Sequence, residues 1–126
     1  MKEKPNFFLC GECKSVHHQL PGTVPAALAG MNPLKANTVE ASLEKHIPVV
    51  SIDKNSVTIK VGSVPHPMST EHYIMWVMLE TNKGYMYRIL NPSEEPVAVF
   101  TLQEEEKPES AYAMCNLHGL WKTELN

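Results

Sequence analysis

A stretch of alternating apolar and polar residues in the middle of the chain most constrains the fold. Val57-Thr58-Ile59-Lys60-Val61 places three apolar side chains on one side of an extended backbone and two polar ones on the other. This is the pattern of a strand with one buried and one solvated face. Residues 53–55 (DKN) have the composition of a turn and join this strand to a second apolar run at 49–52. The pattern predicts antiparallel β-structure rather than a helical domain.

The rest of this half of the chain repeats the alternation of short strands and turns. Residues 72–81 are apolar on both faces and predict a central strand. A turn at 82–84 (NKG) then reverses the chain into residues 85–90 as a hairpin. Residues 97–102 and 111–114 predict two more strands, one on each side of an acidic loop. Strands at this spacing favour a β-sandwich of antiparallel sheets over any βαβ arrangement.

Less regular structure is expected before these strands. Residues 38–45 predict one or two helical turns with Thr38 as N-cap, and the helix must stop before Pro48, which disfavours helical backbone just ahead of it. Residues 21–33 contain prolines and small residues and predict an irregular connection rather than a packed helix.

Composition limits the functions that the chain can have. A length of 126 residues with 43% hydrophobic residues suits one ordinary domain with at most a small appendage. The net charge of -3, without a cluster of Lys and Arg, argues against nucleic acid as a partner. No apolar run approaches the roughly 18 residues that span a bilayer, and the first residues lead into no signal-peptide core. We therefore expect a cytoplasmic protein without membrane association.

Cysteine and histidine residues provide candidates for a metal site. Cys115 and His118 form a C-x2-H pair followed by a glycine, and a thiolate and an imidazole on one turn can bind one metal ion. The same pair can also be ordinary packing. Three further histidines, His46, His66 and His72, stand near prolines or at the start of an apolar run. The sequence thus offers five candidate ligands.

A second cysteine pair lies near the N-terminus. Cys10 and Cys13 form a C-x2-C knuckle, but no second pair follows to complete a tetrahedral site. The knuckle is therefore either a relic turn holding two thiols, or a disulfide under oxidation, or a metal site completed by His17, His18 or a second subunit. Three cysteines in total are an odd count, which argues against a disulfide scaffold.

Four ordered blocks of the chain resemble the superoxide reductases, a family that includes the desulfoferrodoxins and neelaredoxins. The blocks are residues 44–50 (EKHIPVV), 61–68 (VGSVPHPM), 71–74 (EHYI) and 115–121 (CNLHGLW). The resemblance implies an all-β fold, an immunoglobulin-like antiparallel β-sandwich over residues 38–126, with one mononuclear non-haem iron per subunit. The implied iron ligands are four equatorial histidines and one axial cysteine, namely His46, His66, His72, His118 and Cys115.

The same resemblance implies a small, irregular, desulforedoxin-like segment at residues 1–37. Desulfoferrodoxins complete a rubredoxin-type iron site there with an adjacent Cys-Cys pair downstream of the knuckle. In this chain the corresponding neighbourhood reads PAALA at residues 25–29. The segment is therefore expected to be vestigial, without its own iron.

The activity implied by the resemblance is the one-electron reduction of superoxide to hydrogen peroxide. The resemblance also implies an external, rubredoxin-like electron donor, which no motif of this chain identifies. In the family, the residue matching Glu44 can occupy the open position of the oxidised iron. The residue matching Lys45 lies near the open face and attracts the anionic substrate. Relatives form dimers or tetramers, so a homo-oligomer is expected.

Other functions are compatible with the same residues. The iron could serve a non-catalytic electron-transfer or sensor protein, which would lack an open coordination position. A superoxide dismutase would evolve dioxygen and would need no external electron in each turnover. A plain β-sandwich binding module would fold without metal. A superoxide reductase accounts for all five candidate ligands and also for Glu44 and Lys45, and is therefore favoured.

Overall fold

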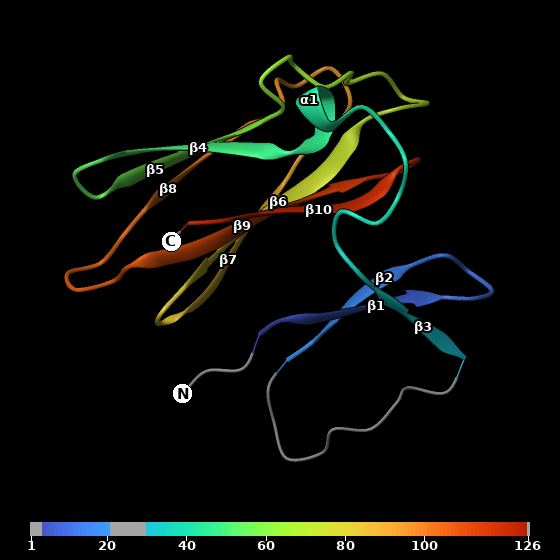
Figure 1. Cartoon of the computed structure of the whole chain (residues 1–126), viewed down its shortest axis with the longest axis horizontal. Coiled ribbons are helices and arrows are strands. Elements are labelled where there is room, and N and C mark those ends of the chain that lie inside the picture. The colour runs from blue at the N-terminus through green and yellow to red at the C-terminus, as the bar shows by residue number, and fades with distance from the viewer. Residues whose placement is uncertain (1–3, 21–29, 126) are drawn as a thin grey trace. The chain divides into compact units, whose positions relative to one another are not determined.

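The computed structural model describes residues 4–20 and 30–125 and divides into two compact units, Met1–Lys35 and Ala36–Asn126 (Figure 1). The first unit contains a three-stranded antiparallel sheet of order β2-β1-β3. Its strands are β1 (Asn6–Cys10), β2 (Val16–Gln19) and β3 (Met31–Leu34). The irregular segment expected here is thus corrected to a small sheet. Of the irregular connection expected at 21–33, residues 21–29 lie outside the described residues and the end is strand β3.

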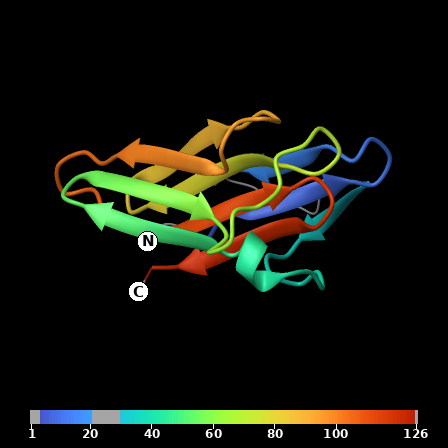
Figure 2. The ribbon, with the colours of Figure 1, turned by 90° about the horizontal axis from the view of Figure 1, so that it is seen from above.

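The second unit is a sandwich of two antiparallel sheets, of order β10-β9-β6-β7 and β4-β5-β8. Figures 1 and 2 show the two sheets as separate layers. The strands are β4 (Pro48–Asp53), β5 (Ser56–Val61), β6 (Ile74–Thr81), β7 (Gly84–Ile89), β8 (Val97–Thr101), β9 (Pro108–Cys115) and β10 (Gly119–Glu124). The predicted all-β fold of antiparallel sheets is confirmed.

The core lies between the two sheets of this sandwich. The apolar residues of the alternating stretch, Val57, Ile59 and Val61, are fully buried on β5. They meet the inward residues of β6, Val77 and Leu79, in one hydrophobic cluster. Strand β6 pairs with β9 on one side and β7 on the other, as expected of a central strand. Burial of such apolar surface is the main force that holds two sheets face to face.

Two elements differ from the sequence prediction. The helix of this unit, α1, covers only Leu43–His46 and has Ser42 rather than Thr38 at its N-cap position. It is limited to one turn because β4 begins at Pro48. Strand β10 was not predicted, since its second half is polar, but it pairs with β9 along its whole length. The pairing partner, not the local composition, makes this segment a strand.

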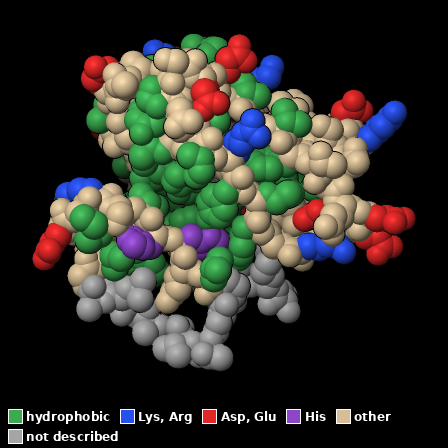
Figure 3. Space-filling view, turned by 180° about the vertical axis from the view of Figure 1, so that it is seen from behind, with side chains coloured by type: hydrophobic (Ala, Val, Ile, Leu, Met, Phe, Trp, Pro, Cys, Tyr) green, Lys and Arg blue, Asp and Glu red, His purple; other side chains and the backbone are tan. Residues whose placement is uncertain are grey.

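The outer face of the four-stranded sheet is also apolar. The ring of Trp76 on β6 lies 5.5 Å from the ring of Tyr87 on β7 in a T-shaped contact. Ile89, which pairs with Trp76, is 66% exposed. In Figure 3 hydrophobic side chains (green) gather on the visible side of the molecule. Within residues 4–20 and 30–125, no helix has the length and apolar character needed to cross a membrane.

Candidate metal centre

Five side chains that are distant in the sequence meet at one end of the sandwich. His46 is the last residue of α1, and His66 lies in the loop between β5 and β6. His72 stands two residues before β6, Cys115 ends β9, and His118 lies in the turn to β10. The antiparallel register pairs Cys115 with the first residue of β6, which brings the loop with His72 next to the cysteine. The five candidate ligands of the sequence are therefore brought together.

The four imidazole rings form a closed square. Going around it, the ring centroids of His46 and His66 are 4.6 Å apart, and those of His66 and His72 are also 4.6 Å apart. The centroids of His72 and His118, and those of His118 and His46, are 5.0 Å apart. Neighbouring rings are nearly perpendicular, with interplanar angles of 78° to 83°. Across the diagonal, His46 and His72 are 6.2 Å apart.

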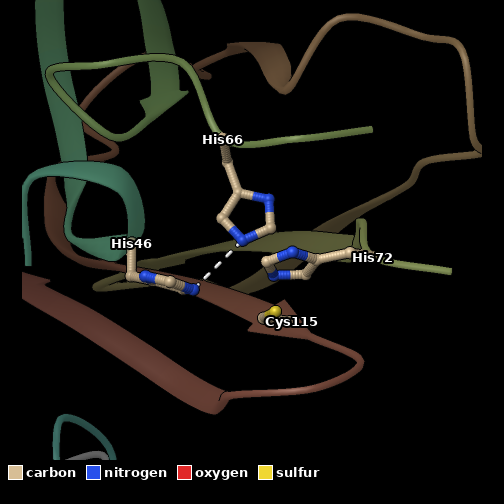
Figure 4. Close-up of side chains that lie close together, drawn as sticks. All are labelled: His46, His66, His72 and Cys115. Atoms are coloured by element: carbon tan, nitrogen blue, oxygen red, sulfur yellow. Dashed lines mark hydrogen bonds between the residues drawn. The ribbon is translucent and has the colours of Figure 1, made fainter. Parts of the chain in front are cut away.

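The potential ligand atoms converge on one point. One ligand atom from each of His46, His66, His72 and Cys115 lies within 4.8 Å of the corresponding atoms of the other three (Figure 4). His118 joins this group through Nδ1, which lies 3.1 Å from Nε2 of His46 and 4.0 Å from Sγ of Cys115. Four nitrogens and one sulfur thus face a common centre.

Hydrogen bonds at Nδ1 of His46 and His66 determine which tautomer each ring adopts. Nδ1 of His46 lies 2.7 Å from the carbonyl oxygen of Ser42, and Nδ1 of His66 lies 2.7 Å from that of Pro67. A carbonyl oxygen only accepts, so each Nδ1 carries the hydrogen and each Nε2 of the neutral ring presents a lone pair. These two Nε2 atoms are 3.1 Å apart, joined by the dashed line in Figure 4. Two facing lone pairs repel, and a cation between them removes the conflict.

The distances fit such a cation. A metal–imidazole bond of about 2.1 Å places neighbouring nitrogens of a square roughly 3.0 Å apart. The two separations from Nε2 of His46, to His66 and to His118, are both 3.1 Å. In addition, Nε2 of His72 is buried and has no hydrogen-bond partner in the described part of the chain. A buried nitrogen without a partner is costly unless a ligand satisfies it. The residues present therefore fit one metal ion.

Burial sets the protonation of the histidines. Loss of solvent is the main cause that lowers the pKa of His46 and His72, and it lowers the pKa of His66 to about 4. The positive charge of other rings in the cluster lowers these three pKa values further, and Lys45 adds to this effect for His46 and His72. Neutral imidazole is the form that binds a metal.

The cysteine sulfur is held on the sandwich side of the cluster. Cys115 is fully buried, and burial raises the pKa of its thiol. The backbone N–H groups of His118, 3.4 Å from Sγ, and of Leu117 act in the opposite direction by donating to the sulfur. The backbone N–H of Asn116 donates to the carbonyl oxygen of Tyr73 at 3.2 Å. Without a cation, a thiolate at this buried position is disfavoured.

Asn116 has a positioning role that the sequence did not reveal. Its Oδ1 accepts from the backbone N–H of Tyr73 at 3.0 Å, and its Nδ2 donates to the carbonyl oxygen of Glu71 at 3.0 Å. Together with its own N–H, it makes three hydrogen bonds to the residues on either side of His72. Asn116 therefore fixes the loop of His72 against the turn of Cys115.

Gly62 permits the close approach of α1. Its φ is +88°, and a Cβ at this position would lie 2.7 Å from the carbonyl oxygen of Lys45 and 2.8 Å from that of Glu44. The third close atom is the carbonyl oxygen of Val64 at 2.3 Å. No side chain fits there, so glycine is required for α1 to present His46 to the cluster.

Trp121 supports the cluster from β10. Its fully buried ring lies 4.8 Å from the ring of His46, and its Nε1 donates to the carbonyl oxygen of His118 at 3.0 Å. One side chain therefore contacts two of the histidines. Trp121 is thus both a core residue and a residue that flanks the cluster.

The two charged residues expected near the site lie on α1. The ammonium group of Lys45 acts electrostatically on both His46 and His72. Glu44 is exposed, and its carboxylate accepts from the hydroxyl of Ser42 at 3.4 Å. Its backbone carbonyl accepts from the N–H of Val64 at 3.0 Å, which ties α1 to the loop after β5. The remaining candidates, Cys10, Cys13, His17 and His18, belong to the other unit.

Comparison with known proteins agrees with this architecture. Residues 38–124 match the family model of desulfoferrodoxin. The desulfoferrodoxin of Syntrophotalea carbinolica is 40% identical over 116 residues, which are 92% of this chain and 90% of that protein. The superoxide reductase of Pyrococcus horikoshii is 33% identical over 99 residues, which are 65% of this chain and 86% of that protein.

The solved structures extend the comparison to the fold. The crystal structure of the superoxide reductase from Treponema pallidum matches with a TM-score of 0.84 and 36% identity, covering 97% of this chain and 100% of that chain. The family resemblance of the four sequence blocks is confirmed, and the cluster of His and Cys indicates an iron-binding oxidoreductase. The chain belongs to the desulfoferrodoxin family.

Proposed function

We propose that this protein reduces superoxide by one electron to hydrogen peroxide at one mononuclear iron per chain. The iron would be held by His46, His66, His72, His118 and Cys115. The observation that carries the proposal is the pair of Nε2 lone pairs of His46 and His66, which face each other at 3.1 Å beside a buried cysteine. This donor set, four imidazoles and one thiolate, suits iron that exchanges single electrons.

The balance of the reaction fixes what the protein must supply. Superoxide takes up one electron and two protons to become hydrogen peroxide. Iron held by these residues would supply the electron by passing between Fe(II) and Fe(III), and an external donor would restore it. The substrate is a small anion, so the protein must attract negative charge and bring protons to the same place.

Lys45 is proposed as the residue that attracts the anion. Its side chain is partly exposed, and its charge reaches both His46 and His72. A cation at the mouth of a site raises the encounter rate with an anion, and this effect weakens as salt is added. Lys45 also offers N–H donors that can order water for proton delivery.

Glu44 is proposed as the residue that controls access to the oxidised iron. It is the neighbour of Lys45 on the single turn of α1, and its backbone is held by hydrogen bonds from Val64 and from the hydroxyl of Ser63. A carboxylate at this place competes with external anions for a ferric ion. Glu44→Ala should therefore let azide bind the oxidised protein more readily, seen as a change in its visible spectrum.

The partners are part of the proposal. The electron donor is expected to be a rubredoxin-like protein, and the protein is expected to form a dimer or tetramer. The exposed side chains of Tyr87 and Ile89 on the outer face of β7 suit such an interface, because exposed apolar area is what association buries.

Stopped-flow mixing of the reduced, iron-loaded protein with superoxide tests the activity. The expected result is second-order oxidation of the iron with one hydrogen peroxide formed per superoxide and no dioxygen evolved. Evolution of dioxygen without an electron donor would assign a dismutase instead. A metal content of two irons per chain, or none after growth in ample iron, would contradict the single iron site.

A further inference from the structure

The turn between β1 and β2 presents a cysteine pair at the surface. Cys10 ends β1, and its N–H donates to the carbonyl oxygen of Ser15 at 2.9 Å. The N–H of Lys14 donates back to the carbonyl oxygen of Cys10 at 3.0 Å, with Lys14 in a left-handed conformation at φ 63°. These two hydrogen bonds close the turn with Cys13 at its exposed tip, while Cys10 is half-buried.

Hydrogen bonds connect the two sulfurs with a serine and a histidine. The N–H of Cys13 donates to Sγ of Cys10 at 3.3 Å, so the turn folds Cys13 back over the first sulfur. Sγ of Cys13 lies 3.1 Å from Oγ of Ser15, which in turn lies 2.7 Å from Nε2 of His17. A hydroxyl that accepts from His17 can donate its own hydrogen to the sulfur. The chain of contacts therefore ends on Cys13.

These donors favour the thiolate. The hydroxyl of Ser15, followed by the thiol of Cys10, lowers the pKa of Cys13 to about 7. The thiolate is the form of cysteine that reacts with oxidants, and exposure gives a small oxidant access to it. A second thiol three residues away in the sequence is the arrangement in which a sulfenic acid is converted to a disulfide.

We propose that Cys10 and Cys13 are a peroxide-sensitive dithiol, in which Cys13 reacts with hydrogen peroxide and Cys10 then closes an intramolecular disulfide. The choice of oxidant rests on the proposed function, because hydrogen peroxide is its product. The proposal gives the small unit a role of its own: it records the peroxide made by the same polypeptide.

The disulfide forms in two steps. The Cys13 thiolate attacks one oxygen of hydrogen peroxide, the O–O bond breaks, and the leaving hydroxide takes a proton to become water, which leaves a sulfenic acid on Cys13. The Cys10 thiol then attacks this sulfur, the S–O bond breaks, and a second water leaves. In total, two thiols are oxidised to one disulfide while one hydrogen peroxide is reduced to two waters. His17 and Ser15 are placed to pass the proton to the first leaving group.

The test treats the full-length, iron-loaded protein in its ferric form with hydrogen peroxide and follows the thiols by alkylation and mass spectrometry. The expected result is loss of both alkylatable thiols at the same rate. The peptide that contains residues 10–13 should become lighter by two hydrogens, and dithiothreitol should restore it. A disulfide between two chains, or a pair that resists alkylation until a chelator removes a shared metal ion, would overturn the proposal.

Variants separate the roles of the two sulfurs. In Cys10→Ser, peroxide should leave a sulfenic acid on Cys13 that dimedone traps. In Cys13→Ser, oxidation of Cys10 should be about tenfold slower at pH 7, because Cys10 is half-buried and the hydroxyl of Ser15 lies beside the other sulfur. Equal rates for the two single variants would contradict the assignment of Cys13 as the attacking thiol.

Ser15→Ala tests whether the hydroxyl of Ser15 promotes ionisation of Cys13, because only that role would change the pH dependence of Cys13 oxidation. Oxidation of Cys13 should slow about five- to tenfold at pH 6.5 and reach the rate of the unaltered protein above roughly pH 9.5, where either thiol is ionised. Ser51→Ala, at an exposed serine of the other unit, is the matched control and should change nothing. A pH profile unaltered by Ser15→Ala would overturn the relay.

Failure of this proposal is distinguishable from failure of the proposed function. Added peroxide tests the dithiol whether or not the iron reacts with superoxide. If added peroxide forms the disulfide but superoxide leaves the iron unoxidised, the proposed function is wrong and the dithiol stands. If superoxide oxidises the iron but the thiols ignore added peroxide, the dithiol is wrong.

Discussion

The two units of this protein place cysteine in opposite surroundings. Cys115 is fully buried at the end of β9, and burial raises the pKa of its thiol. Cys13 is exposed in the turn after β1, and hydrogen bonds lower its pKa to about 7. At the first sulfur the thiolate needs a cation beside it, whereas at the second the thiolate forms in water and meets dissolved oxidants. The same residue type therefore suits metal binding in one unit and thiol chemistry in the other.

Removing each sulfur in turn is the strongest test of this difference between Cys115 and Cys13. Cys115→Ser should lower the rate of superoxide reduction at least ~100-fold and remove the visible band of ferric thiolate, because loss of a ligand exceeds the 10- to 100-fold effect typical of its supporting residues. Cys13→Ser should leave both within about twofold. Stopped-flow kinetics and visible spectra of the iron-loaded proteins measure the difference. Similar losses in both variants would end the separation of roles.

Gly62→Ala should disrupt the metal centre without touching a ligand. The added Cβ would meet three carbonyl oxygens at 2.3 to 2.8 Å, so α1 must move away from β5. We expect a loss of about 3 kcal/mol in the free energy of unfolding, together with weaker iron retention.

Gly84→Ala is the matched control for this change. Gly84 also has a positive φ, but a Cβ there would meet no atom within 4 Å. Its cost should be limited to about 1 kcal/mol from the backbone conformation, with iron binding unchanged. Denaturant unfolding and metal analysis of both variants separate close approach from backbone strain. Equal effects would show that the contact with α1 does not matter.

The pH dependence of stability sharpens the comparison for the histidines. In the metal-free protein His66 has its pKa lowered to about 4 by burial, while the unfolded chain takes up a proton near the ordinary value of about 6.5. The unfolded state therefore binds more protons between these values, and the free energy of unfolding falls as the pH falls through this window. We expect a loss on the order of 2 kcal/mol from His66 between pH 7 and pH 4.

Urea unfolding of the metal-free protein at a series of pH values measures this loss. His66→Gln, which cannot titrate, should remove the largest part of the slope. An identical slope in this variant would show that the buried imidazole is not its source.

The smallest effect is expected from the charge on α1. Lys45→Ala should lower the second-order rate with superoxide about three- to tenfold and flatten its dependence on salt, because the attraction of the anion is lost. Lys54→Ala, an exposed lysine in the turn between β4 and β5 at the other end of β5, is the control and should leave both unchanged. An unchanged rate in Lys45→Ala would remove this residue from the mechanism.

Local patterns predicted the sandwich better than they predicted its details. The alternation at Val57–Val61 and the turn residues around it are local signals, and they gave strands that the structure contains. Strand β10 was missed because its polar second half is held by pairing with β9, and the small sheet of the first unit was missed for the same reason. Such pairing is tertiary information, which composition within a window does not carry.

The candidate site depended on a different kind of information. The residues themselves offered five candidate ligands, but no spacing rule links His46 with Cys115. Their assignment to one iron came from the resemblance, and the closed square of rings emerged only in three dimensions. Asn116 and Gly62 were missed as positioning residues because their partners, the loop of His72 and the backbone of α1, are remote in sequence. A glycine inside a block that matches the family was the available signal for the second of them.

The hydrogen bonds from Nδ1 of His46 and His66 to backbone carbonyl oxygens fix both tautomers before any ion arrives. Both Nε2 atoms therefore present their lone pairs to any divalent ion that enters. Because these two rings do not have to rearrange, they cannot select iron over another divalent metal. Zinc and copper bind imidazole and thiolate more tightly than ferrous iron does. Which metal the protein carries should consequently follow supply in the cell, and protein made in zinc-rich medium should contain zinc.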